Sequence, residues 1–351
     1  MNFRVPNKLP ILLAILAAAC YGISSPISKL LLNELSPVFM AALLYLGAGL
    51  GMLAVRTAMS MKKQKKKEAR ITKKEIPFVL GMIILDIIAP ILLMLGLTMT
   101  SPATVSLLNN FEIVATSVIA LAIFKEAIGK RLWIAITFIT LSSILLSAED
   151  FRNLSFSLGA VFALLACVCW GFENNCTRML SLKDPLQIVI IKGFGSGTGA
   201  LLIAAFARTL SANALYILFA LLLGFFAYGL SIYFYILAQR ELGAARTSAY
   251  YAIAPFIGVG LSYVIFRQGF TVSFVFALAI MILGTYFAAF EKHKHAHIHM
   301  QIEHEHRHSH TDGHHNHAHD YPVTEHSHQH THEPLTHEHP HTPDMHHVHS
   351  H

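Results

Sequence analysis

The chain has 351 residues, of which 54% are hydrophobic and only 13% are charged, and its formal net charge is +6. Because soluble domains carry about 25% charged residues, this composition excludes an ordinary soluble globular protein. All 23 histidines lie between His293 and His351, so the chain divides into an apolar body and a histidine-rich end.

The body consists largely of apolar runs, each bounded by charge, proline or a short polar link. Crossing a bilayer takes about 20 apolar residues in a helix. Because backbone polar groups in lipid must be satisfied within the segment, runs of this length are expected to be helices. They cover approximately residues 10–32, 36–56, 76–99, 101–124, 131–148, 157–180, 185–208, 213–238, 242–266 and 270–290. We therefore predict an all-α membrane protein with ten transmembrane helices.

The link between the second and third runs, "RTAMSMKKQKKKEARITKKE", is dense in lysine and arginine. Beside a membrane span, such a segment indicates retention in the cytoplasm and contact with anionic lipid heads rather than nucleic-acid binding. Placing it inside also places Lys130, Lys183 and Lys292 inside. With an even number of spans, both termini are predicted to be cytoplasmic, in a multi-pass protein of the plasma membrane.

The sequence of the body is duplicated. "YLGAGLGMLA" in the second run matches "GFGSGTGALL" in the seventh, and Pro37 matches Pro185 at the same offset. "CYG" at Cys20 corresponds to "CWG" at Cys169, with a register that differs by one residue. An odd number of helices per copy turns the second copy upside down. We predict two inverted five-helix repeats, residues 1–150 and 151–292, followed by a tail of residues 293–351.

Several of these features resemble the EamA-type repeat of the drug/metabolite transporter superfamily. They are "YG" and "WG" on the first helix of each half, and "SP" and "DP" at the start of the second helix. The segments "SPATVSLLNNFEIV" and "GAARTSAYYAIAPF" enter the fourth helices, and Glu126 closes the first of these. The second half departs from the pattern at Gln268, where the family usually has Glu. In the first half, Ile113 stands where the second has Pro255. The resemblance implies a ten-helix carrier that works by alternating access, often an exporter of small metabolites.

Polar side chains inside the predicted spans are candidates for a substrate site, because ionisable groups are costly in hydrocarbon and are usually functional there. The alternative is that they only join helices by hydrogen bonds, as the amide of Asn109 can, or that Lys192 merely neutralises a carboxylate. Cys169, Glu173 and Cys176 share one helical face, which leaves open a soft divalent metal site. The substrate-binding candidates are Tyr21, Ser25, Asp86, Asn109, Glu112, Trp170, Glu173, Asn174, Lys192 and Tyr251.

The tail lacks apolar periodicity and contains several prolines, so we predict that it is disordered. Imidazole is a common ligand of zinc, nickel and cobalt, and repeated His-x-His offers many interchangeable ligand sets. A polar tail without metal, or a pH-dependent polycation, is the alternative. "HEHRH" and "HEHPH" fit a zinc-protease pattern that needs one rigid helix, and Pro340 breaks the second. The predicted metal ligands are His293, His295, His297, His299, His304, His306, His308 and His310.

These features predict a secondary-active transporter, an exporter of a small organic metabolite, with a metal-binding cytoplasmic tail and no required cofactor. The alternative is a carrier of divalent metal ions or metal–chelate complexes. A third hypothesis is a membrane-anchored metal buffer. No catalytic residues and no nucleotide-binding motif are predicted, so we expect neither an enzyme nor direct coupling to ATP. The expected partners are a small-molecule substrate, the lipid bilayer and divalent ions at the tail, but not nucleic acid.

Overall fold

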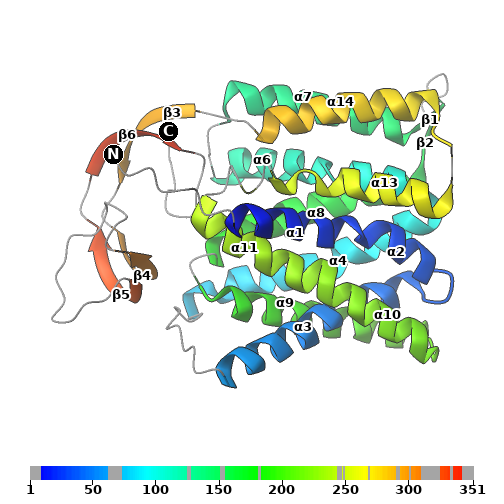
Figure 1. Cartoon of the computed structure of the whole chain (residues 1–351), viewed down its shortest axis with the longest axis horizontal. Helices are drawn as coiled ribbons and strands as arrows, with labels where there is room; N and C mark the ends of the chain where they lie inside the picture. The colour runs from blue at the N-terminus through cyan, green and yellow to red at the C-terminus, as the bar shows by residue number, and fades with distance from the viewer. Residues whose placement is uncertain are drawn as a thin grey trace.

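The computed structural model describes residues 9–61, 73–124, 128–150, 155–180, 183–242, 247, 250–267 and 269–289. In the tail it describes the backbone of residues 293–299, 302–309, 325–332 and 335–341. The helices form one bundle, with their axes roughly along its length (Figure 1). They are α1 (Leu9–Gly22), α2 (Ser24–Leu31), α3 (Pro37–Met61), η1 (Lys73–Glu75), α4 (Ile76–Met99), α5 (Pro102–Leu108), α6 (Phe111–Phe124), α7 (Lys130–Ser147), α8 (Leu158–Leu180), α9 (Pro185–Phe206), α10 (Ala214–Gly224), η2 (Phe225–Leu230), α11 (Ser231–Leu242), α13 (Ala254–Phe266) and α14 (Val272–Ala289).

The predicted apolar spans are confirmed as helices. Within the described residues, 9 helical segments are long and apolar enough to cross a membrane, and α13 is a shorter apolar helix. The first, fourth and eighth predicted runs are each interrupted. The first divides into α1 and α2, the fourth into α5 and α6, and the eighth contains the π-helical turn η2 between α10 and α11. The ninth run, 242–266, is described only in part.

The "SP" and "DP" pairs mark helix starts for a physical reason. Ser36 accepts a hydrogen bond from the backbone N–H of Phe39 (3.3 Å), and Asp184 accepts one from Leu186 N–H (3.0 Å). These bonds satisfy amides that have no partner within the helix, and the proline that follows suits the first helical position. Pro37 opens α3 and Pro185 opens α9.

The helices pack in pairs. The most extensive contacts join α3 with α9, α4 with α8, α7 with α14, α1 with α11 and α6 with α8, and α5 also packs on α13. The crossing of α3 and α9 is tight because glycines face each other. A Cβ added at Gly193 would lie 2.4 Å from the backbone nitrogen of Gly49. Small residues at such a crossing allow the two backbones to approach closely.

Replacing Gly193 with valine should therefore destabilise the bundle, by about 1–3 kcal/mol or more, because the new side chain overlaps the backbone of α3. The melting temperature of the purified protein in detergent measures the effect. Gly260→Val is the matched control, since a Cβ at Gly260 meets nothing within 4 Å. Equal melting temperatures for the two variants would contradict the tight crossing.

The two ends of the bundle differ. The start of α1 and the end of α14 lie at one end, together with the tail strands, and the short strands β1 (Ala148–Asp150) and β2 (Ser155–Phe156) lie at the other (Figure 1). The described part of the tail has four strands in two antiparallel pairs: β3 (His293–His299) with β6 (Leu335–His341), and β4 (Ile302–Ser309) with β5 (Glu325–His332). The predicted disorder is not confirmed for these segments. Their alternating His-x-His pattern has the two-residue period of a strand. Above, the same pattern was used only to predict metal ligands.

Candidate functional site

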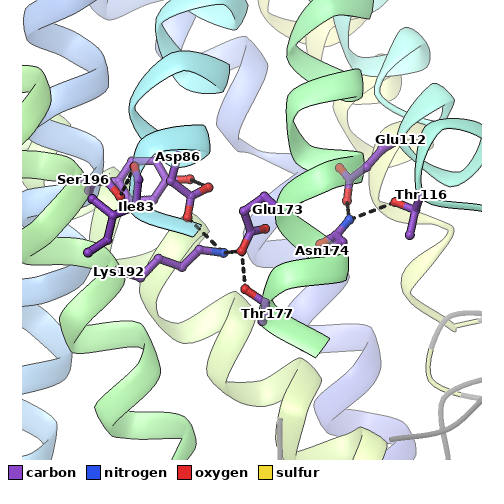
Figure 2. A network of polar contacts seen from close by, with 10 residues as sticks. Ile83, Asp86, Glu112, Thr116, Glu173, Asn174, Thr177, Lys192 and Ser196 are labelled. Atoms are coloured by element: carbon purple, nitrogen blue, oxygen red, sulfur yellow. Dashed lines mark hydrogen bonds and ion pairs between the residues drawn. The ribbon is translucent and has the colours of Figure 1, made fainter. Parts of the chain in front are cut away.

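Three charged side chains from different helices meet in the interior of the bundle. Lys192 of α9 lies with its Nζ 3.2 Å from Oδ2 of Asp86 on α4 and 2.9 Å from Oε1 of Glu173 on α8 (Figure 2). These residues are 6%, 0% and 2% exposed, respectively. Isolated charges in hydrocarbon are costly, so mutual pairing is what allows them to be buried. One ammonium group is thus shared by two carboxylates.

Hydroxyl groups complete this charged cluster of Asp86, Glu173 and Lys192. Tyr45 of α3 donates a hydrogen bond to Oδ1 of Asp86 (2.7 Å), and Thr177 donates to the same oxygen of Glu173 that faces Lys192. The cluster therefore ties α3, α4, α8 and α9 together.

A third carboxylate, Glu112, lies beside the charged cluster without an ion pair. Asn174 of α8 donates from Nδ2 to Oε1 of Glu112 (2.7 Å) and to Oγ1 of Thr116 (3.2 Å), as Figure 2 shows. Glu112 is the second residue of α6, where the helix dipole favours a negative charge. Among the side chains that the structure describes, no lysine or arginine lies within ion-pair distance of Glu112.

The turn before Glu112 leaves buried polar atoms without partners. Within the described part of the chain, Oδ1 of Asn109 and Nδ2 of Asn110 make no hydrogen bond. Asn109 is 8% exposed, and its backbone carbonyl, unlike its side chain, accepts a hydrogen bond from the backbone N–H of Glu112 (3.1 Å). Buried groups of this kind are usually paired, so the turn between α5 and α6 is unusual.

Tyrosine rings from both halves of the chain gather near these carboxylates. The ring of Tyr21 lies edge-on to Tyr228 (centroids 6.1 Å apart) and is stacked on Tyr251 (6.0 Å). Tyr45 lies 5.3 Å from Tyr228, which also receives a hydrogen bond from Ser24 (3.4 Å). The rings continue from Tyr45, which hydrogen-bonds Asp86, to Tyr251 on the far side of Tyr21.

Comparison with known proteins identifies the family. The sequence model of the family described as "EamA-like transporter family" matches residues 8–148 and 157–290. The chain belongs to the EamA-like transporter family. The resemblance inferred from the "YG/WG" and "SP/DP" motifs is thereby confirmed.

Individual relatives of this EamA-like transporter are distant. An "Uncharacterized transporter" of Methanothermobacter thermautotrophicus (strain Delta H) is 25% identical over 289 residues, which are 78% of this chain and 83% of the relative. A protein of known crystal structure has a TM-score of 0.57 and 14% identity, and the match covers 80% of this chain and 95% of that one. The latter similarity concerns the fold alone.

The structure brings together most of the predicted site residues of this transporter. Asp86, Glu173 and Lys192 form the charged cluster, Glu112 pairs with Asn174, and Tyr21 stacks on Tyr251. Trp170 is buried in the hydrophobic cluster that contains Tyr45 and Tyr228. Ser25 is buried, but Ser24 is the serine that hydrogen-bonds Tyr228.

The remaining predicted sites concern metal. Where side chains are described, no group of three or more His, Cys, Asp or Glu residues is arranged to hold an ion. Glu173, which the spacing grouped with Cys169 and Cys176, faces Lys192 instead. The side chains of the predicted tail ligands, and all of His310, lie outside the described residues.

Sequence reasoning missed Tyr45, Tyr228 and Thr116 as members of the site. One available signal was that a tyrosine hydroxyl inside a span needs a hydrogen-bond partner. A second signal, the local helix geometry, is visible only in the structure. Tyr228 lies in the π-helical turn η2, and such turns are frequent at functional sites.

Proposed function

We propose that this EamA-like transporter is a secondary-active carrier that exports a small organic metabolite across the plasma membrane by alternating access. The observation that carries the proposal is the convergence of charged and aromatic groups inside the bundle. They come from α1, α3, α4 and α6 in the first half of the chain and from α8, α9 and η2 in the second half. A bundle that only anchored a tail would need no such groups. Polar residues at membrane depth usually mark a solute pathway.

Helix pairing supports the two proposed repeats, residues 1–150 and 151–292. Equivalent helices pack against each other: α3 on α9, α5 on α13, and α7 on α14. Two further pairs join non-equivalent helices of the two repeats. The third helix of the first repeat, α4, packs on the first helix of the second, α8, and α1 packs on α11. This is the pattern of a pseudo-two-fold axis, as in inverted repeats whose rocking alternates access to a central site.

A solute screen tests the transport function. Cells that express the protein should lose a loaded solute faster than cells without it, and the solutes that show this difference define the cargo. If no solute among amines, amino acids, sugars and organic acids is exported faster, the proposal of a metabolite exporter fails.

We also propose that both termini are cytoplasmic. Arg56 and Glu75 stand at the two ends of the basic loop. They pair with Asp184 (3.8 Å) and Lys183 (3.3 Å), respectively, which lie between α8 and α9. A cysteine introduced in "KKQKKK" or in the tail should be protected from an impermeant thiol reagent in intact cells. A cysteine near Arg152 should react. Labelling of the basic loop and the tail from opposite sides would overturn the topology.

The tail is proposed to bind divalent metal. The register of β3 and β6 places His293, His295 and His297 opposite His341, His339 and His337, and β4 and β5 pair histidines in the same way. Residues directly opposite in an antiparallel pair share one face, about 4.5–5.5 Å apart at Cβ. Histidine is the residue type that most commonly binds zinc, nickel or cobalt.

A peptide of residues 293–351 should accordingly bind these ions by itself. Binding should weaken as the pH falls through about 6.5, the ordinary pKa of imidazole, because protons compete for the lone pairs that bind metal. Calorimetric titration at pH 7.5 and pH 5.5 measures the difference. A peptide that binds no metal at neutral pH would leave the tail without this role.

Deleting the tail separates the proposed cargo from the alternative one. If an organic solute is the cargo, deletion should leave metal-free transport unchanged and remove only a response to added metal. If metal or a metal chelate is the cargo, deletion should raise the concentration needed for half-maximal flux, because ions are no longer concentrated at the inner side.

A further inference from the structure

The charges inside the bundle are unbalanced. Among the described side chains of the interior, Asp86, Glu112 and Glu173 can carry a negative charge, and only Lys192 carries a positive one. Lys192 is already bound by Asp86 and Glu173. Among the described side chains, Glu112 therefore has no counter-ion at membrane depth, where an uncompensated carboxylate is costly. These three carboxylates and one ammonium group leave two negative charges in excess, and a cation from outside the protein would offset the one on Glu112.

Two acceptor atoms near Glu112 are also unused. Asn174 donates to Oε1 of Glu112, and in the described structure nothing donates to Oε2. Oδ1 of Asn109, on the preceding turn, is buried and likewise accepts no hydrogen bond. The buried Oδ1 of Asn109 requires a donor, and Oε2 of the partly exposed Glu112 can accept one. An ammonium group offers several N–H donors, whereas a carboxylate or phosphate offers none.

The aromatic rings of Tyr21, Tyr228 and Tyr251 favour the same kind of ligand. The carboxylate of Glu112 is within electrostatic range of the phenol groups of Tyr21, Tyr228 and Tyr251. These three rings form the stacked and edge-on group described above. The faces of tyrosine rings attract cations within about 6 Å, and they also cover the apolar part of a bound molecule.

The two acidic sites differ in exposure. Asp86, Glu173 and Lys192 are buried, whereas Glu112, Asn174, Tyr21 and Tyr251 are each partly exposed. Glu112, Tyr21 and Tyr251 are therefore more accessible than the charged cluster.

We propose that the solute carried by this transporter is a small organic cation, a protonated amine. Its ammonium group binds Glu112 with help from Asn109, and its apolar part packs against Tyr21, Tyr228 and Tyr251. This inference rests on the proposed transport function and specifies its substrate class. The excess negative charge disfavours organic anions, and neutral solutes leave Glu112 uncompensated.

Matched probes test the inference on the wild-type, full-length protein in detergent. Three skeletons (butyl, phenylethyl and indolylethyl) are each compared as the ammonium, the alcohol and the carboxylate by calorimetric titration. We expect at least one ammonium probe to bind at least tenfold more tightly than its alcohol and its carboxylate. If every ammonium probe binds no better than its partners, the inference is overturned. Export of any solute in the cell-based screen would then still support a transporter, so the two failures are distinguishable.

Variants locate the binding site. Glu112→Gln should remove the tenfold preference for the ammonium probe, and Tyr251→Leu should weaken binding of the same probe with Glu112 intact. Glu34→Gln is the control, since Glu34 is an exposed acid in the turn after α2. If Glu112→Gln and Tyr251→Leu both keep the full tenfold preference for the ammonium probe, the assignment to this site is overturned.

Discussion

Replacing Lys192 with methionine is expected to destabilise the folded protein by about 3–5 kcal/mol, because two buried carboxylates lose the positive charge that they share. Asp86 is fully buried and Glu173 nearly so, and neither can reach water to compensate. The yield of monodisperse protein and its melting temperature in detergent measure the loss. Lys130→Met, at an exposed position at the start of α7, should leave both unchanged.

A rescue experiment distinguishes charge from packing. Adding Asp86→Asn and Glu173→Gln to Lys192→Met removes all three charges while keeping side chains of similar size. Replacing a buried ionic group as a whole is often neutral or stabilising, whereas removing one partner is not. The triple variant should therefore recover most of the lost stability. A single variant as stable as the wild type would show that the two ion pairs contribute little to the fold.

The helices of this protein could be predicted because their signals are local. Runs of apolar residues and the capping pairs Ser36–Pro37 and Asp184–Pro185 act within a few residues, whatever the rest of the chain does. The interruption at η2 could not be predicted in this way. Nothing within "FFAYGL" distinguishes a π-helical turn from the α-helix around it, and the packing of this turn against α3 is a long-range contact that a local pattern does not show.

The site could be predicted only in part, because a sequence does not give the rotation of each helix. Tyr228 and Tyr263 both lie in apolar helices, yet Tyr228 is 3% exposed in the interior and Tyr263 is 52% exposed at the surface. Adjacent serines show the same limit. One position along a helix is a rotation of about 100°, which brings Ser24 rather than Ser25 to Tyr228.

Charged residues were easier to predict, because their cost in a membrane makes any position in a span significant. Which carboxylate Lys192 would neutralise was nevertheless open. Its contacts depend on three helices, α4, α8 and α9, meeting at one depth, and that meeting depends on long-range packing. The pairing of Lys192 with two carboxylates, and the isolation of Glu112, are therefore results of the structure.

Glu112→Gln should abolish transport while leaving the protein folded. No described lysine or arginine pairs with Glu112, so its neutralisation leaves no buried cation unpaired, and the amide oxygen of glutamine can still accept from Asn174. Loss of a buried charge pair with the solute costs about 2–5 kcal/mol of binding, or roughly thirtyfold or more in affinity. Flux in loaded cells and the melting temperature together measure the two effects.

Glu173→Gln provides the complementary measurement. Lys192 keeps its contact with Asp86 at 3.2 Å, so one positive and one negative charge remain and the variant should still fold. We expect its transport to be lost as well, because the uncharged side chain can no longer help to hold a coupling ion. If both variants export normally, with Glu34→Gln as the unchanged control, the carboxylates only fix helix packing. The interior network would then be structural, and the solute pathway would have to lie elsewhere in the bundle.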